Sequence, residues 1–331
     1  MSTATTGLTE PADTPAPARS SAPRLRGAAA RRLLGAAAVL LGAATVAFAA
    51  LQLVPGDPVT VMLGPGTAAT PEVKAAIQQQ YGLDRPVPVQ YLTYLGHLVT
   101  GDLGESYQLQ RPVADLIGDQ LGPTVQLGAA ALALAVLLAL LAAVGTAGRR
   151  PALRALSSFA ELLSVSSPSY WIGILLLTAF SFQLRIFPVA GDDGLVALVL
   201  PAVTLALPVA GMLAQVLREG LETALGQPFV LTARSRGVGS AAVVLRHALR
   251  HAAVPVVTLT GWLTGSLLGG AVLVESVFGR PGIGALTLQA TTNKDLPLVI
   301  GLVLLSALVF VVISALVDLL YLVIDPRLRT D

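Results

Sequence analysis

Residues that could bind the phosphates of a nucleotide are scarce in this sequence of 331 residues. A phosphate-binding loop of the form G-x-x-x-x-G-K-[ST] needs a lysine that is followed by serine or threonine. The chain has only two lysines: Lys74 precedes Ala75, and Lys294 precedes Asp295. The chain therefore cannot bind ATP through that motif, and we expect it to bind no cofactor of its own.

Metal ligation and disulfide chemistry are equally unsupported. Cysteine is absent, which excludes disulfides and thiolate zinc sites. His97, His247 and His251 do not converge in sequence. The last two are four residues apart, but they flank Arg250 on a basic segment without a carboxylate cluster. We predict no metal site and no catalytic residues, so the chain is not expected to be an enzyme.

Carboxylates that could couple transport to an ion lie only at the ends of apolar runs. An ionisable group in the middle of a membrane helix is costly and therefore usually functional. Glu161, Glu275 and Asp318 all sit at run ends. For Asp318 we expect pairing with a cytoplasmic arginine such as Arg327. Proton or sodium coupling is thus weakly supported.

The elements that must position these residues are apolar. Hydrophobic residues make up 54% of the chain and charged residues 12%, with a mean hydropathy of +0.75, whereas a soluble domain has roughly 25% charged residues. Six charge-free runs are each long enough to cross a membrane as a helix. They cover residues 33–56, 125–148, 162–184, 194–217, 252–274 and 296–317. We predict an all-α polytopic membrane protein with six transmembrane helices.

The amino-terminal region has two interpretations. Residues 1–30 are rich in Ala, Pro, Ser and Thr without an apolar period, so we expect a disordered cytoplasmic tail. Arg31 and Arg32, followed by an apolar stretch and Ala47-Phe48-Ala49, also resemble a cleaved secretory signal. The run is longer than a signal core, which favours a first transmembrane helix at 31–56.

Arginine placement predicts the orientation. Fifteen of the 21 basic residues fall on one side when the amino terminus is placed inside. Both termini, including residues 325–331, are therefore expected in the cytoplasm. The net charge is only +2 and the basic residues are scattered between apolar runs, so a nucleic-acid interface is excluded.

Two connecting segments are too long to be simple links. The outer one, residues 57–124, contains an amphipathic stretch at 87–99, so we expect short helices on the external face. The inner one, residues 218–251, has an apolar and basic helical pattern and should be a structured cytoplasmic element.

Two patterns inside the runs concern packing or a pathway. Gly261, Gly265 and Gly269 form a smooth stripe, which either packs against a helix or lines a passage. The polar segment Ser166-Ser167-Pro168-Ser169 interrupts the third run with a proline. It favours a wet pathway, with an interhelical hydrogen-bonded kink as the alternative.

The inner segment carries a recognisable pattern. The stretches Val230-Leu-Thr-Ala-Arg-Ser-Arg-Gly237 and Leu245-Arg-His-Ala-Leu-Arg-His-Ala-Ala-Val-Pro255 resemble the "EAA" loop of binding-protein-dependent ABC importers, in the form of the dipeptide, oligopeptide and nickel permeases. Other motifs agree in order: Val54-Pro-Gly-Asp-Pro58, Tyr81-Gly-Leu-Asp-Arg-Pro86, Ser166-Ser-Pro-Ser-Tyr-Trp171, Pro281-Gly-Ile-Gly284 and Asp325-Pro-Arg327.

The resemblance implies a fold, a site and partners. It implies the type I importer transmembrane fold over residues 121–324, after an extracytoplasmic region at 57–120. It also implies an ATPase-coupling loop in which Gly237 supplies a turn and arginines face the partner. The residues expected in that loop are Thr232, Ala233, Arg234, Ser235, Arg236, Gly237, Arg246 and His247. The first acid of the motif name is absent here, so a salt bridge from it is not expected.

The implied complex lies in the bacterial inner membrane. It has this chain as its first permease, a second related permease, two ATPase subunits that use ATP and Mg, and an extracytoplasmic binding protein. Peptides are the expected cargo, with nickel, glutathione or another small solute as alternatives. An ion-coupled transporter or a membrane-embedded enzyme would need mid-membrane ionisable groups, an inverted repeat or convergent polar residues, which the sequence lacks.

Overall fold

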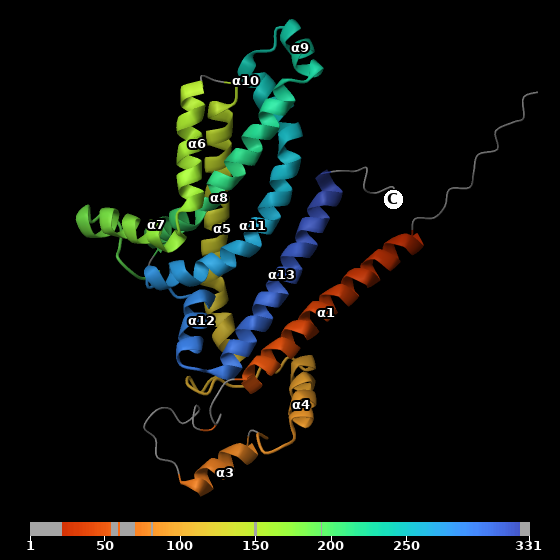
Figure 1. The fold of residues 1–331 in the computed structure, drawn as a ribbon, viewed down its shortest axis with the longest axis vertical. Helices are drawn as coiled ribbons and strands as arrows, with labels where there is room; N and C mark the ends of the chain where they lie inside the picture. The colour runs from red at the N-terminus through yellow and green to blue at the C-terminus, as the bar shows by residue number, and fades with distance from the viewer. Residues whose placement is uncertain are drawn as a thin grey trace, which may run out of the picture.

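The protein is a bundle of long helices with smaller helices at both ends (Figure 1). A computed structural model describes residues 22–53, 59, 70–80, 82–148, 151–192 and 194–324. Within these residues the one strand-like feature printed by the backbone is an isolated bridge between Glu105 and Pro112. The all-α architecture is thus confirmed.

Five helices are long and apolar enough to cross a membrane, and a bent pair supplies a sixth crossing if it is counted as one. The long elements are α1 (Ala22–Leu53), α5 (Val113–Thr146), α8 (Gly194–Leu225), the continuous segment Ser240–Val277 that ends in α11 (Leu249–Val277), and α13 (Leu296–Ile324). The six crossings predicted from the apolar runs agree with the upper count.

The helices extend beyond the apolar runs that predicted them. Helix α1 begins at Ala22, so residues 22–30 are helical and not part of a disordered tail. Helix α5 begins at Val113, well before the predicted residue 125, and α8 continues to Leu225. Polar residues at a membrane border can continue a helix, because the helical backbone bonds itself wherever the side chains meet water. Residues 1–21 and 325–331 lie outside the described residues.

The third predicted crossing is not one helix. It divides into α6 (Pro151–Ser166) and α7 (Ser169–Leu176), which continues as the π-helical η1 (Leu177–Gln183), and the two arms meet at 106°. Pro168 is the N-cap of α7 and cannot continue α6. The break therefore turns the chain sharply, and α7 runs across the bundle in Figure 1.

Helix α8 is the centre of the bundle. Its buried face meets α5 and α11 in a core where α5 contributes small residues one turn apart, Ala131, Ala135 and Ala139. Small side chains let two helix backbones approach closely, which gains packing contacts where water cannot drive association. The same principle applies at Gly211 of α8, where an added Cβ would lie 2.8 Å from the Glu161 carbonyl of α6.

The glycine stripe of α11 serves packing at its cytoplasmic end. An added Cβ on Gly261 would collide with Val317 of α13, while one on Gly265 would just reach Phe310. A Cβ on Gly269 would meet nothing within 4 Å, and this residue is exposed. The stripe thus packs against α13 at Gly261, and the role of Gly269 in a pathway remains a prediction.

The outer end carries α3 (Pro71–Gln80), α4 (Val87–Val99) and α12 (Ile283–Thr292). The predicted amphipathic helix at 87–99 is confirmed as α4. Buried carboxylates hold this end together. Glu275 of α11 accepts hydrogen bonds from the Thr124 hydroxyl at 2.6 Å and from the Gly284 and Ala285 amides at 2.8 and 3.1 Å. A single carboxylate therefore joins α5 and α11 to the start of α12.

Candidate functional site

The inner segment forms a compact helix-turn-helix at the end of the bundle opposite α3 and α4 (Figure 1). Helix α9 (Pro228–Ser235) starts with proline at its first position, where the missing N–H costs no hydrogen bond. It ends at Gly237, whose φ of +82° is in the left-handed region that favours glycine. The predicted turn at Gly237 is thus confirmed.

The turn after α9 has the hydrogen bonds of a Schellman motif. The Gly237 amide donates to the Arg234 carbonyl at 2.9 Å, and the Val238 amide donates to the Ala233 carbonyl at 3.1 Å. Val238 also packs on a small core of Val230, Ala233 and Val243. This core fixes α9 against the next helical segment, so the whole element is stiff.

The predicted coupling residues divide between two faces. Ala233 is buried in this core, so it cannot face a partner as expected, because it lies one turn after buried Val230. The remaining members are exposed: Thr232, Arg234, Ser235, Arg236, Gly237, Arg246 and His247. The analysis of the sequence missed Leu231, which is 74% exposed and lies on the same helical face as Arg234 and Ser235.

The element passes directly into a membrane-crossing helix. After the turn, α10 (Ser240–Ala242), the π-helical η2 (Val243–Ala248) and α11 run on without interruption to Val277. A second core at this end joins α5, α8 and α11 through residues that include Ala143, Leu221 and Ala252. An added Cβ on Gly220 would lie 3.0 Å from the Ala252 Cβ, so the backbones of α8 and α11 approach closely here. A force on α9 is thus applied to both α8 and α11.

A buried ion pair lies beside this connection, and the sequence did not reveal it. Glu161 of α6 and Arg218 of α8 are each 5% exposed and are joined by two hydrogen bonds, one of 2.8 Å from Nη1 to Oε1. The Ser157 hydroxyl donates to Glu161 at 2.7 Å, and Arg218 also reaches Thr146 of α5 at 3.3 Å. Arg218 was expected at the start of the inner loop, but α8 extends past it and buries it. The i, i+4 spacing of Ser157 and Glu161 was the one local signal.

The predicted pathway residues lie apart from the coupling element. Ser166 ends α6, and Ser167 and Pro168 form the bend before Ser169 starts α7. The Ser167 hydroxyl donates to the Leu163 carbonyl at 2.7 Å, so this bond is local and does not join two helices. A wet pathway at this bend remains a prediction.

No group of three or more His, Cys, Asp or Glu side chains that could hold a metal occurs in the described part of the chain. The three histidines are separated: His97 contacts Asp102, His251 stacks on Phe229, and His247 is exposed. The predicted pairing of Asp318 with Arg327 falls outside the described residues.

Comparisons with known proteins agree with this architecture. The family described as "Binding-protein-dependent transport system inner membrane component" matches residues 115–330, and the N-terminal family of the same transport systems matches residues 28–128. A protein of Brucella ovis named as a peptide permease is 39% identical over 294 residues, which cover 85% of this chain and 92% of that protein.

Two further similarities extend the comparison. The glutathione transport system permease protein GsiC of Salmonella typhimurium is 37% identical over 302 residues, or 90% of this chain and 97% of that protein. A chain from an inward-facing structure of the MetNI methionine ABC transporter superposes with a TM-score of 0.52 at 17% identity. It covers 63% of this chain and 96% of that one, and it supports the transmembrane fold of an ABC importer.

Proposed function

Because the chain belongs to the family of inner membrane components of binding-protein-dependent transport systems, we propose that it carries peptides through the membrane in a complex driven by ATP hydrolysis on separate subunits. The observation that carries this proposal is the stiff element around α9. It presents Leu231 and Arg234 outward while its core is locked onto the helix Ser240–Val277.

The exposed face of α9 has the composition of a docking surface. A large apolar side chain in the solvent, flanked by arginine, is typical of residues that dominate the binding energy of an interface. We assign this face to an ATPase subunit, one of two that bind ATP and Mg. The chain itself holds no nucleotide-binding motif.

In the proposed cycle, ATP closes the ATPase dimer and moves α9. Since α9 is packed on α8 and α11, both crossings rotate with it, and the bundle changes between inward-open and outward-open states. An extracytoplasmic binding protein delivers the cargo to the outer face, and a second related permease completes the pathway. The termini and α9 lie in the cytoplasm, in agreement with the arginine distribution.

Peptides are the proposed cargo because a relative of 39% identity is named as a peptide permease. The second candidate is glutathione, which relatives of 36–37% identity are named as transporting. Nickel or another small solute remains the third class. Binding assays on the partner binding protein separate these cargos.

The docking assignment is tested by Leu231→Ser. The side chain is exposed, so the substitution should leave folding unchanged, while ATPase co-purification should fall about tenfold or more, as for loss of a central interface residue. Leu245→Ser is the matched control, since Leu245 is also exposed on this element but lies outside α9. Equal losses of co-purification in both variants would contradict the assignment of the α9 face.

The coupling role is tested by Gly237→Val. Valine at φ +82° costs roughly 1–2 kcal/mol, because its Cβ clashes with the backbone in the left-handed region. The turn should shift, so that uptake falls about five- to thirtyfold while the complex still assembles. Gly239→Ala is the control, since Gly239 has a φ of −64° and no neighbour within 4 Å of an added Cβ. Normal uptake by the Gly237→Val variant would refute the coupling role.

A further inference from the structure

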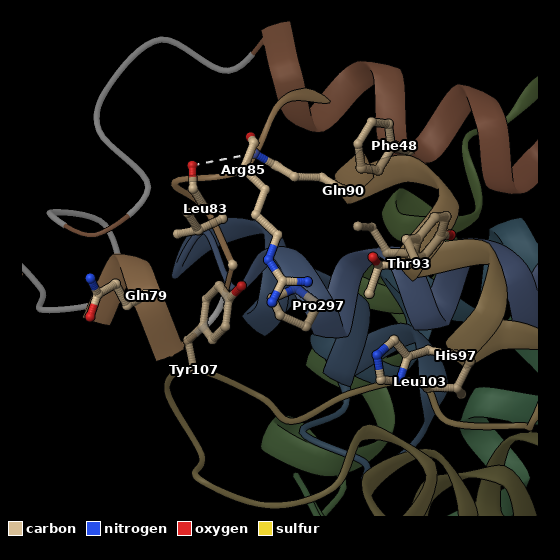
Figure 2. A pocket seen from close by; sticks show the side chains of 13 residues that line it. Phe48, Gln79, Leu83, Arg85, Gln90, Thr93, His97, Leu103, Tyr107 and Pro297 are labelled. Carbon is tan, nitrogen blue, oxygen red and sulfur yellow. Dashed lines mark hydrogen bonds between the residues drawn. The ribbon is translucent and has the colours of Figure 1, made fainter. Parts of the chain in front are cut away.

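A cavity of about 400 Å³ lies at the outer end of the bundle, away from the coupling element. Segments from four helices and one loop enclose it, and Figure 2 shows their side chains converging. The lining residues are Phe48, Gln79, Gly82, Leu83, Arg85, Gln90, Thr93, Tyr94, His97, Leu103, Tyr107, Pro297 and Ile300. Phe48 belongs to the apolar span of α1, and Pro297 and Ile300 begin the span of α13. The cavity is therefore at the border between the membrane and the outer solution.

Contacts across the chain hold the walls in place. The Phe48 ring packs on Tyr91 and Tyr94 of α4, with centroid distances of 5.2 and 5.6 Å. Gln90 donates to the Leu83 and Arg85 carbonyls at 3.3 and 2.7 Å, which fixes the turn before α4 (Figure 2). These contacts make the cavity a formed site, since its walls need no rearrangement to accept a ligand.

The loop on the other side of the cavity is also anchored. Buried Asp295, at the start of α13, accepts hydrogen bonds from the Ser106 hydroxyl and from the Tyr107 and Gln108 amides, the latter two at 3.2 and 3.3 Å. Ser106 in turn accepts from the Leu109 amide at 2.9 Å. Leu103 and Tyr107 are thereby fixed as walls of the cavity.

The cavity has an excess of positive charge. The Arg85 guanidinium projects into it between Tyr107 and Thr93 (Figure 2), and the described part of the chain offers Arg85 no ion pair. None of the lining residues is acidic. His97 also lines the cavity, but its Nδ1 is 2.9 Å from an Asp102 carboxylate oxygen. A planar guanidinium without a carboxylate is suited to bind an oxyanion with two parallel hydrogen bonds.

A second donor lacks a partner in the cavity wall. The Tyr94 hydroxyl is buried and has no hydrogen-bond partner among the described residues. Burial raises the pKa of Tyr94 to about 12, so the hydroxyl remains protonated at neutral pH and can donate. A buried donor without a partner costs free energy, which an incoming acceptor would recover.

The remaining walls are apolar and belong to lipid-facing helices. Phe48, Pro297 and Ile300 form this side, and nearby α4 exposes Leu92 and Val99 outside the spans. A ligand that fits both sides combines an oxyanion with an apolar part, and it must be available at the membrane border. Tyrosines at this depth are also typical of the region of lipid headgroups.

From this arrangement we propose that the outer cavity binds the phosphate of an anionic phospholipid, with Arg85 holding the phosphate oxygens and Tyr94 donating a further hydrogen bond. The shared chemistry is a phosphate oxyanion, which could also come from free phosphate in solution. The lipid source is favoured because two membrane-spanning helices form the apolar wall. This site is independent of the proposed transport function.

The test is native mass spectrometry of the full chain, purified in its complex and delipidated, then titrated with phosphatidylglycerol. Arg85→Gln should weaken lipid binding about tenfold or more, since it removes a charge-assisted contact. Tyr94→Phe keeps the ring on Phe48 and should weaken binding about threefold. Arg111→Gln is the control, because Arg111 also lies on the outer side but pairs with Asp119 at 2.9 Å and is not in the cavity. It should bind as the unmodified chain does.

A second series guards against misfolding and identifies the source of the phosphate. Arg85→Lys keeps the charge without the planar fork, so it should lose less affinity than Arg85→Gln while unfolding at the same temperature as the unmodified chain. Phosphatidylglycerol binding that is the same in the Arg85→Gln and Arg111→Gln variants would overturn the proposal. Arg85-dependent retention of inorganic phosphate without lipid would overturn the lipid source.

Discussion

The buried pair of Glu161 and Arg218 allows a quantitative prediction about what holds α6 to α8. Arg218→Met removes the cation and leaves the Glu161 carboxylate buried, with Ser157 as its remaining printed partner. Breaking a buried pair from one side costs about 3–5 kcal/mol, because an uncompensated charge stays in a medium of low dielectric constant. We expect the free energy of unfolding to fall by about that amount.

The chain supplies a matched control on the same two helices. Arg154 of α6 and Glu222 of α8 are 3.0 Å apart, but their side chains are 54% and 29% exposed. Arg154→Met should therefore cost only about 0.2–1 kcal/mol, since water screens both charges before and after the change. The double variant Glu161→Met with Arg218→Met should recover most of the loss, because it removes both desolvated charges at once.

The assay is steric trapping of unfolding in detergent micelles, with the two single variants and the double variant forming a thermodynamic cycle. A coupling free energy of several kcal/mol is expected for the buried pair and less than about 1 kcal/mol for the exposed pair. If Arg218→Met cost no more than Arg154→Met, burial would not be the origin of the effect and the reasoning would be refuted.

Two further predictions follow from the packing and from the outer tyrosine. Gly261→Val should destabilise the bundle by about 1–3 kcal/mol through its collision with Val317, whereas Gly269→Ala, which meets no atom, should be neutral in the same unfolding assay. A loss in the Gly269 variant as large as that at Gly261 would contradict the packing assignment. Tyr94 has a pKa of about 12 in the folded chain, above its ordinary value of 10. Its contribution to stability is therefore fully present below pH 10 and is lost as the pH rises towards 12. Phenolate absorbance should show one tyrosine that titrates about two units late and disappears in Tyr94→Phe, and an unchanged titration curve in that variant would contradict the assignment.

Local signals in the sequence predicted a large part of the fold. Apolar length predicted six crossings, because a helix must satisfy its own backbone in lipid. The amphipathic period predicted α4 at 87–99, and Gly237 predicted the turn after α9. Each of these features depends on residues within one or two helical turns.

Other features could not be predicted in this way. The proline in Ser166–Ser169 indicated a break, but not that the two arms meet at 106°. The charge of Arg218 indicated a loop on the cytoplasmic side, although the extended α8 buries it. Leu231 was overlooked because its exposure depends on which face of α9 packs on Val243.

The sequence by itself determined the membrane class, the helical elements, the missing nucleotide site and the position of the coupling turn, because these follow from side-chain chemistry close along the chain. The tertiary structure alone decided which charges meet. Arg218 pairs with Glu161 at a separation of 57 residues, Thr124 with Glu275 at 151, and Ser106 with Asp295 at 189. Such pairs depend on how whole helices pack, and the free energy of that packing is spread over contacts that no local pattern records.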